Sequence, residues 1–309
     1  KDAANLKSNQ KNVGTIKSSN LCVTPETYVL TREGQFPIYS LWVGNHHIST
    51  QEEHRYIDVW NGQEYSTVEV MKTGENVQEF VRVECTDGSV LTCTPYHKFY
   101  IQDIVQDGDR EEDSDDENTI EMEAKDLLDG MILQKSNFPV IEDGLHFPDG
   151  KTEAHTLGCE SGMHNIRLEK ENAHLENIFV PVNHCLEAKL AWFYAFLEPY
   201  IADEVIERDT IIYLPSRSFT FTQDMKLMLQ TCGVNVVIRK VKKHDNGVKR
   251  ILYQLAIHIC QIRQLLCLDK QFAIPNIDCN YKLSRAEKTY TPEVCVQNVV
   301  KIENKTEDT

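Results

Sequence analysis

One junction divides this sequence and limits what the chain can fold into. Residues up to Leu21 are polar and cationic, whereas Cys22–Thr31 alternates between apolar and polar side chains, as a half-buried β-strand does. Further short alternating runs, with an Asp87–Gly88 turn before the last, lie at 68–73, 79–84 and 90–94. Many short strands with few helices predict a curled, all-β body over residues 22–135.

The middle of the chain has a different pattern. Helical spacing and turn residues predict a helix, a strand, a second helix closed by Gly233, a hairpin and a last helix, at 187–197, 210–214, 222–232, 235–257 and 260–268. Strand character then returns near the end of the sequence. The predicted fold is therefore mainly β, with an α/β insertion at 152–272 that interrupts a β-domain resumed at 276–309.

Composition and charge restrict the possible functions. The net charge is −16, and the stretch 103–123 is so acidic that we expect a self-repelling loop there. An acidic chain is a poor general binder of nucleic acid, since phosphate contacts need Lys and Arg. No apolar run predicts a membrane span, and the 10 cysteines include no C-x-x-C pair, so no structural zinc site is predicted. We expect reduced cysteines and a cytoplasmic location.

The sequence on each side of the junction resembles a different known family. Cys22, followed about seventy residues later by Thr94-Pro-Tyr-His97, resembles the start and the B-type block of an intein, a self-splicing element. That resemblance implies a horseshoe-like, all-β splicing (Hint-type) domain. Residues 1–21, which end in Asn20-Leu21, resemble the large subunit of a class I ribonucleotide reductase just before its active-site cysteine. The resemblance implies a host-enzyme segment interrupted at its catalytic site.

The intein resemblance implies roles for four residues. The Cys22 thiol would attack the carbonyl carbon of Leu21 and convert that amide into a thioester, without a cofactor. His97 would protonate the leaving nitrogen, and Thr94 would hold the geometry or the oxyanion. The last intein segment is expected to end in His-Asn, whereas this sequence ends at Thr309. We therefore expect a partner, a C-terminal intein fragment with its downstream extein, in a split or truncated element.

The insertion resembles a homing endonuclease of the LAGLIDADG class, whose two motif helices each end in a metal-binding Asp. The matching positions here are Ser161 and Tyr200, and the nearby carboxylates Glu160 and Glu198 are displaced along the motif. Because hydroxyls do not replace metal-binding carboxylates, we expect a degenerate nuclease, with Mg²⁺ needed only if it were active. No metal is expected for the splicing chemistry.

Basic residues around the predicted hairpin are the candidates for DNA contact: Arg239, Lys240, Lys242, Lys243, Lys249 and Arg250. The alternative interpretation is a solvated hairpin tip, which the overall negative charge favours, so DNA binding is expected to be weak or absent. Three functions therefore stay open at this stage: an autoprocessing intein, a DNA-cleaving endonuclease, and an inactive fragment of a ribonucleoside-diphosphate reductase.

Overall fold

The computed structural model describes residues 22–43, 55–70, 79–102, 119–134, 136–170, 178–201, 210–245, 248–269, 283–288 and 290–303. Contacts divide the chain into two compact units. The β unit takes in Phe36–Ser136 together with the segments up to Thr31 and from Glu293. The α/β unit takes in Arg32–Gln35 and Asn137–Pro292. Within the described residues, no helix is both long enough and apolar enough to cross a membrane.

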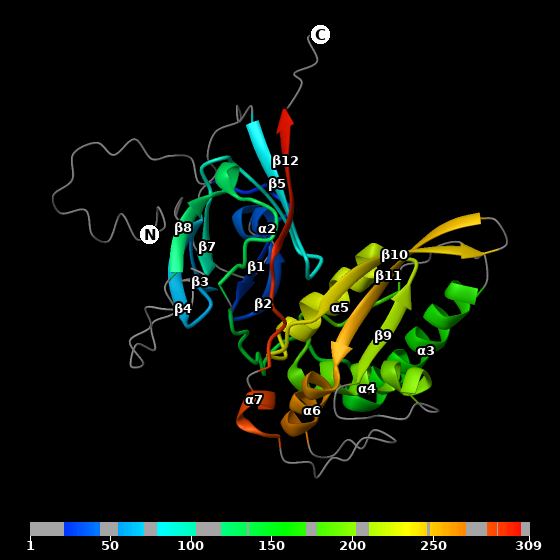
Figure 1. Cartoon of the computed structure of the whole chain (residues 1–309). Coiled ribbons are helices and arrows are strands. Elements are labelled where there is room, and N and C mark those ends of the chain that lie inside the picture. The colour runs from blue at the N-terminus through cyan, green and yellow to red at the C-terminus, as the bar shows by residue number, and fades with distance from the viewer. Residues whose placement is uncertain are drawn as a thin grey trace, which may run out of the picture. The chain divides into compact units, whose positions relative to one another are not determined.

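The β unit is built from short strands (Figure 1). Its elements are β1 (Tyr28–Thr31), β2 (Gly34–Pro37), α2 (Ile38–Val43), β3 (Arg55–Trp60), β4 (Tyr65–Val70), β5 (Glu79–Cys85), β6 (Val90–Cys93), β7 (Lys98–Gln102), β8 (Thr119–Glu123), a 3₁₀ turn at Ala124–Asp126 and β12 (Val296–Glu303). They form three sheets, ordered β2-β1-β3-β4, β12-β5-β6 and β7-β8, although Gly34 and Gln35 of β2 belong to the α/β unit. The chain is strand-rich, as predicted.

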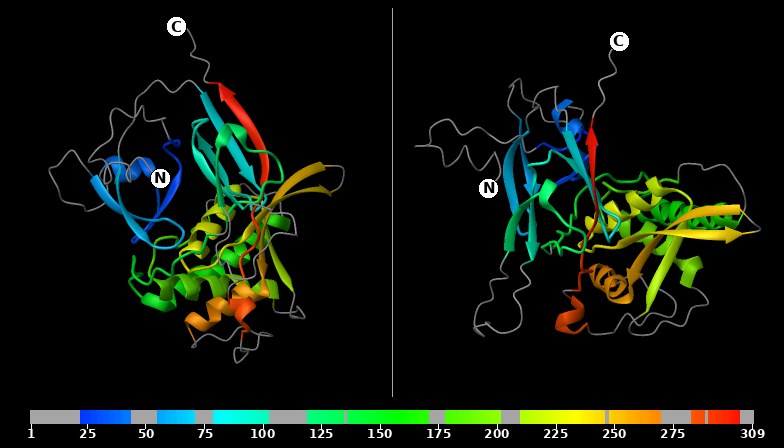
Figure 2. Two further views of the ribbon diagram at one scale, coloured as in Figure 1. Left: turned by 60° about the vertical axis from the view of Figure 1, so that its left-hand side comes forward. Right: turned by 45° about the horizontal axis from the view of Figure 1, so that its top comes forward.

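The sheet β12-β5-β6 joins segments from both ends of the sequence. Strand β12 pairs antiparallel with β5, with Val299 opposite Val83, and Figure 2 shows the two strands side by side in both views. The Asp87–Gly88 turn links β5 to β6, where Gly88 has φ +79° and the Asp87 carboxylate accepts from the Ser89 N–H at 3.0 Å. Alternate residues of β5, Val81 and Val83, are buried in the core of this unit.

One sequence expectation is wrong in part. The acidic stretch 103–123 was expected to be a loop, yet Thr119–Glu123 forms β8 and pairs with β7. Glu121 forms an ion pair with Lys98 of β7, and Glu123 lies 2.6 Å from Lys125, so the carboxylates at this end have cationic partners. Opposite charges across a strand pair stabilise it, which offsets the repulsion between the acidic residues. Residues 103–118 lie outside the described part of the chain.

The α/β unit contains one antiparallel sheet, ordered β10-β11-β9, with helices packed beside it (Figure 1). Its elements are α3 (Gly150–Lys170), α4 (Leu186–Ile201), β9 (Ile211–Ser216), α5 (Phe219–Gln230), β10 (Val237–Asp245), β11 (Val248–His258), α6 (Ile259–Leu268) and α7 (Arg285–Lys288). Helix α4 is the centre of the core, and Trp192, Phe196 and Leu197 are completely buried. Helix α5 ends before Gly233, whose φ of +84° suits the predicted closing glycine.

Candidate functional site

The backbone of Cys22 is hydrogen-bonded to Thr94, the residue that follows β6. Its N–H donates to the Thr94 hydroxyl at 3.1 Å, and its carbonyl accepts from the Thr94 N–H at 2.9 Å. Val23 forms an antiparallel bridge with Cys93, which continues the pairing one residue further. Cys22–Thr24 is therefore an added edge of the sheet that contains β5 and β12. The nitrogen held by Thr94 belongs to the peptide bond with Leu21, a residue outside the described range.

Thr94 and His97 are the first and last residues of a tight turn. The His97 N–H donates to the Thr94 carbonyl at 3.0 Å, which closes a four-residue β-turn with Pro95 in its second position. Pro is favoured there because its fixed φ matches the turn. The His97 carbonyl accepts from the Ala124 N–H at 2.7 Å, and its half-buried ring meets Phe99 edge-on. The spacing Thr-x-x-His thus places both side chains at one end of β6.

Two cysteines near this turn have different chemical characters. Cys93 is completely buried, and burial raises the pKa of its thiol to about 12. Cys22 is half-buried. Because the thiolate is the reactive form, Cys93 is a core residue that does not compete as a nucleophile. Cys22 is thus in contact with Thr94, and His97 ends the turn that begins at Thr94, so these three stay the candidate residues that the sequence predicts.

The positions that match the two endonuclease motif acids lie on α3 and α4. Ser161 is buried on α3. On α4, the Tyr200 hydroxyl accepts from the Asn165 amide at 2.8 Å, and burial raises the pKa of this phenol to about 12. A neutral phenol held by an amide does not offer the charge of a metal-binding carboxylate. Glu160 and Glu198 are both exposed.

Two basic residues of the hairpin already have partners within the α/β unit. Arg239 lies over the Tyr213 ring, 5.7 Å from its centroid, and Lys243 lies 3.4 Å from Glu169. Side chains alternate along a strand, so Lys240 and Lys242 project from the opposite face of the sheet to Arg239 and Lys243. Arg250 on β11 pairs with Lys243 on β10. The structure does not describe the side chain of Lys249. The basic residues thus do not form one continuous stripe.

Sequence reasoning missed one cluster of potential ligands. His155 and Cys159 on α3 and Glu198 on α4 place an imidazole nitrogen, a sulfur and a carboxylate oxygen within 4.8 Å of one another. The available signal was the spacing of His155 and Cys159, four residues apart on one helical face. A search for C-x-x-C pairs does not detect such a pattern.

Comparison with known proteins relates the chain to a reductase. It is 30% identical over 281 residues to the ribonucleoside-diphosphate reductase large subunit of Invertebrate iridescent virus 6. The match covers 77% of this chain and 27% of that protein, so the chain spans about a quarter of the relative's length. Since residues 1–21 are a small part of the chain, most of the matched residues lie from Cys22 onwards. No family model matches the chain.

Proposed function

We propose that this chain carries an intein-type autoprocessing element, which begins splicing by an N–S acyl shift at the Leu21–Cys22 bond. The observation that supports it most directly is the hydrogen bond from the Cys22 N–H to the Thr94 hydroxyl. This bond holds the nitrogen that must leave when the peptide breaks. It joins residues 72 positions apart that the sequence resemblance pairs independently.

In the proposed step, the Cys22 sulfur forms a bond to the carbonyl carbon of Leu21 while the bond from that carbon to the Cys22 nitrogen breaks. The thiol loses its proton, and the nitrogen gains one to become a free amine. His97 supplies that proton, a role worth about 10²- to 10⁴-fold in rate for a well-placed imidazole. Thr94 keeps the nitrogen in place. The product is a thioester, and the step needs no metal or cofactor.

The same proposal accounts for the organisation of the chain. Residues 22–135 and 276–309 would form one Hint-type splicing domain, in agreement with the pairing of β12 with β5 across the intervening sequence. Residues 152–272 would be a degenerate LAGLIDADG-type insert with weak or no DNA binding. Residues 1–21 would be the host segment. Completing the splicing reaction would require a C-terminal intein fragment with its downstream extein as a partner, in the cytoplasm.

The test is intact-mass spectrometry of the purified chain after incubation with excess dithiothreitol. The proposal expects residues 1–21 to be released as a thiol adduct, and Cys22→Ala to release none. The matched control is Cys295→Ala, which changes another half-buried cysteine of the β unit. The same measurement is repeated with an added C-terminal intein fragment. Absence of release from the wild-type chain in both conditions would contradict the proposal.

A second candidate function is supported by the relative itself. The matched region extends well beyond residues 1–21, and the alternative is therefore that the segment from Cys22 is part of a reductase fragment with no activity of its own. This alternative expects no cleavage at Leu21–Cys22 under any condition, even with the C-terminal piece supplied. It also expects no Mg²⁺-dependent cutting of DNA, which separates it from the endonuclease interpretation.

A further inference from the structure

Helices α3 and α4 approach closely because two glycines face the partner helix. A Cβ added to Gly158 would lie 2.2 Å from the Trp192 carbonyl oxygen, and one added to Gly162 would lie 2.8 Å from the Phe196 carbonyl oxygen. Both contacts advance by four residues, so the two helices run in the same direction. The close approach allows side chains on the edge of the pair to meet from both helices.

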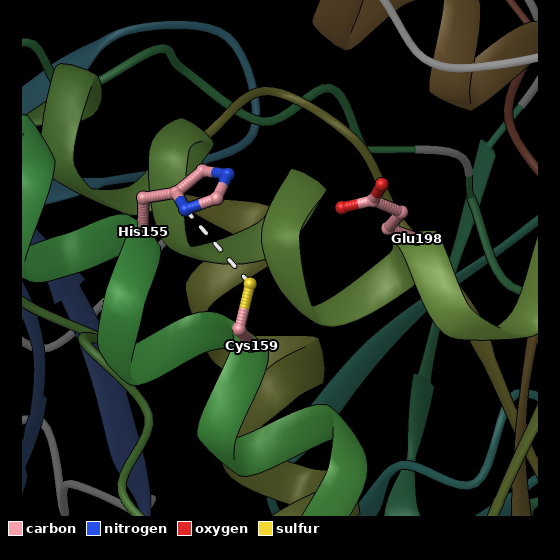
Figure 3. Close-up of side chains that lie close together, drawn as sticks. All are labelled: His155, Cys159 and Glu198. Atoms are coloured by element: carbon pink, nitrogen blue, oxygen red, sulfur yellow. Dashed lines mark hydrogen bonds between the residues drawn. The ribbon is translucent and has the colours of Figure 1, made fainter.

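Three potential metal ligands meet at this edge. His155 and Cys159 are one helical turn apart on α3, with 3.8 Å between Nδ1 and Sγ. Glu198 reaches them from α4, and the three ligand atoms all lie within 4.8 Å of one another. Figure 3 shows the imidazole, thiol and carboxylate directed toward a common space. His155 and Glu198 are exposed and Cys159 is half-buried, so an ion can reach the cluster from solvent.

The separation between the imidazole nitrogen and the sulfur is close to that in a tetrahedral zinc site, and the Glu198 carboxylate lies within 4.8 Å of both. With Zn–N of about 2.0 Å and Zn–S of about 2.3 Å, the nitrogen and sulfur ligands of one ion lie about 3.5 Å apart. The observed separation of 3.8 Å is within a small side-chain adjustment of that value. The ligand types also select the ion, because thiolate and imidazole favour Zn²⁺ whereas Mg²⁺ and Ca²⁺ prefer oxygen ligands.

We propose that His155, Cys159 and Glu198 bind one Zn²⁺ ion that cross-links α3 to α4. Three protein ligands leave the fourth tetrahedral position for water or for a ligand from another molecule. The site is separate from Cys22, Thr94 and His97 and does not depend on the splicing proposal. An ion that binds only the folded α/β unit stabilises it by mass action.

The experiment is a Co²⁺ titration of the metal-free, full-length chain, followed by absorption spectroscopy and displacement with Zn²⁺. The wild-type protein is expected to bind one Co²⁺ per chain, to develop a thiolate-to-cobalt charge-transfer band, and to lose that band when Zn²⁺ is added. Its thermal unfolding midpoint should rise with Zn²⁺. Cys159→Ser should abolish the band, and His155→Ala or Glu198→Gln should weaken Co²⁺ binding at least tenfold.

The control variants change the same residue types outside the cluster. Cys267→Ser alters an exposed thiol of α6, and Glu142→Gln alters an exposed carboxylate of the same unit away from the cluster, so both should bind Co²⁺ as the wild type does. Circular dichroism of each metal-free variant checks that it is folded. A band that persists in Cys159→Ser, or no thiolate band in the wild-type chain, would overturn the proposal.

Discussion

The backbone N–H of Cys22 lies 3.1 Å from the Thr94 hydroxyl oxygen to which it donates, although 72 positions separate the two residues. Thr94 is only 3% exposed, so its hydroxyl is shielded from competing water. A hydrogen-bond acceptor that is shielded from water restrains the peptide N–H that it binds more strongly than an acceptor exposed to water would. This relationship makes the Thr94 hydroxyl the first group to test.

Replacing Thr94 with Ala should slow dithiothreitol-induced release of residues 1–21 by about 10- to 100-fold, because losing a buried hydrogen-bond partner costs about 1–3 kcal/mol. Thr94→Ser keeps the hydroxyl and should stay near the wild-type rate. Time-resolved intact-mass spectrometry measures both. Equal rates for Thr94→Ala and the wild type would remove Thr94 from the proposed mechanism.

Cys93 should resist alkylation in the folded protein. With a pKa of about 12, its thiolate fraction at pH 8 is about a thousandfold lower than that of an ordinary thiol, whose pKa is about 8.5. Its complete burial slows the reaction further. Peptide mapping after iodoacetamide treatment should show early labelling of the exposed Cys267 and labelling of Cys93 only in denaturant. Early labelling of both would mean that the core around β6 opens readily.

Gly158→Ala should destabilise the α/β unit, although the same change in an exposed helix is usually stabilising. The added methyl would lie 2.2 Å from the Trp192 carbonyl oxygen, and relieving such overpacking costs about 1–3 kcal/mol. Chemical denaturation measures the loss in unfolding free energy. Glu160→Ala, an exposed change two residues away, is the control and should have little effect. Comparable effects in the two variants would argue against close packing of α3 and α4.

Asp224 on α5 gives a prediction about pH. Burial raises the pKa of its carboxyl to about 6, from a usual value of 3.8. The folded state therefore holds this proton more tightly than the unfolded state, and its contribution to stability is lost as pH rises from about 4 through 6. Asp224→Asn removes the charge of this half-buried carboxyl and should raise the unfolding free energy by about 1–2 kcal/mol at pH 8, less than the full pKa difference implies because solvent screens part of it, while changing little at pH 4.

Denaturant unfolding of Asp224→Asn between pH 4 and 8 tests that expectation. The matched control is Asp143→Asn, since Asp143 is an exposed carboxylate of the same unit. Its unfolding free energy should follow the wild-type pH dependence. A constant difference between Asp224→Asn and the wild type across this pH range would show that the Asp224 carboxyl is not the group that titrates.

Local sequence patterns predicted many elements of both units. The 222–232 pattern corresponds to α5, although α5 begins at Phe219 because Ser218 caps it by accepting from the Phe221 N–H. The predicted hairpin corresponds to β10 and β11, and the returning strand character to β12. Helix α3 (Gly150–Lys170) was not among the predicted elements, although the motif position Ser161 lies on it. Gly158 and Gly162 weaken the helical pattern of the sequence. They are tolerated in α3 because a side chain at either position would collide with the backbone of α4.

The sequence by itself determined the alternation of β5, the Asp87–Gly88 turn and the spacing of Thr94 and His97, since each depends on neighbours within a few residues. Only the tertiary structure decided that the Thr94 hydroxyl meets the Cys22 nitrogen, and that Glu198 meets His155 and Cys159. These contacts depend on the register between strands and on how closely helices α3 and α4 pack. Both are set by packing between segments distant in the chain, and no local propensity encodes them.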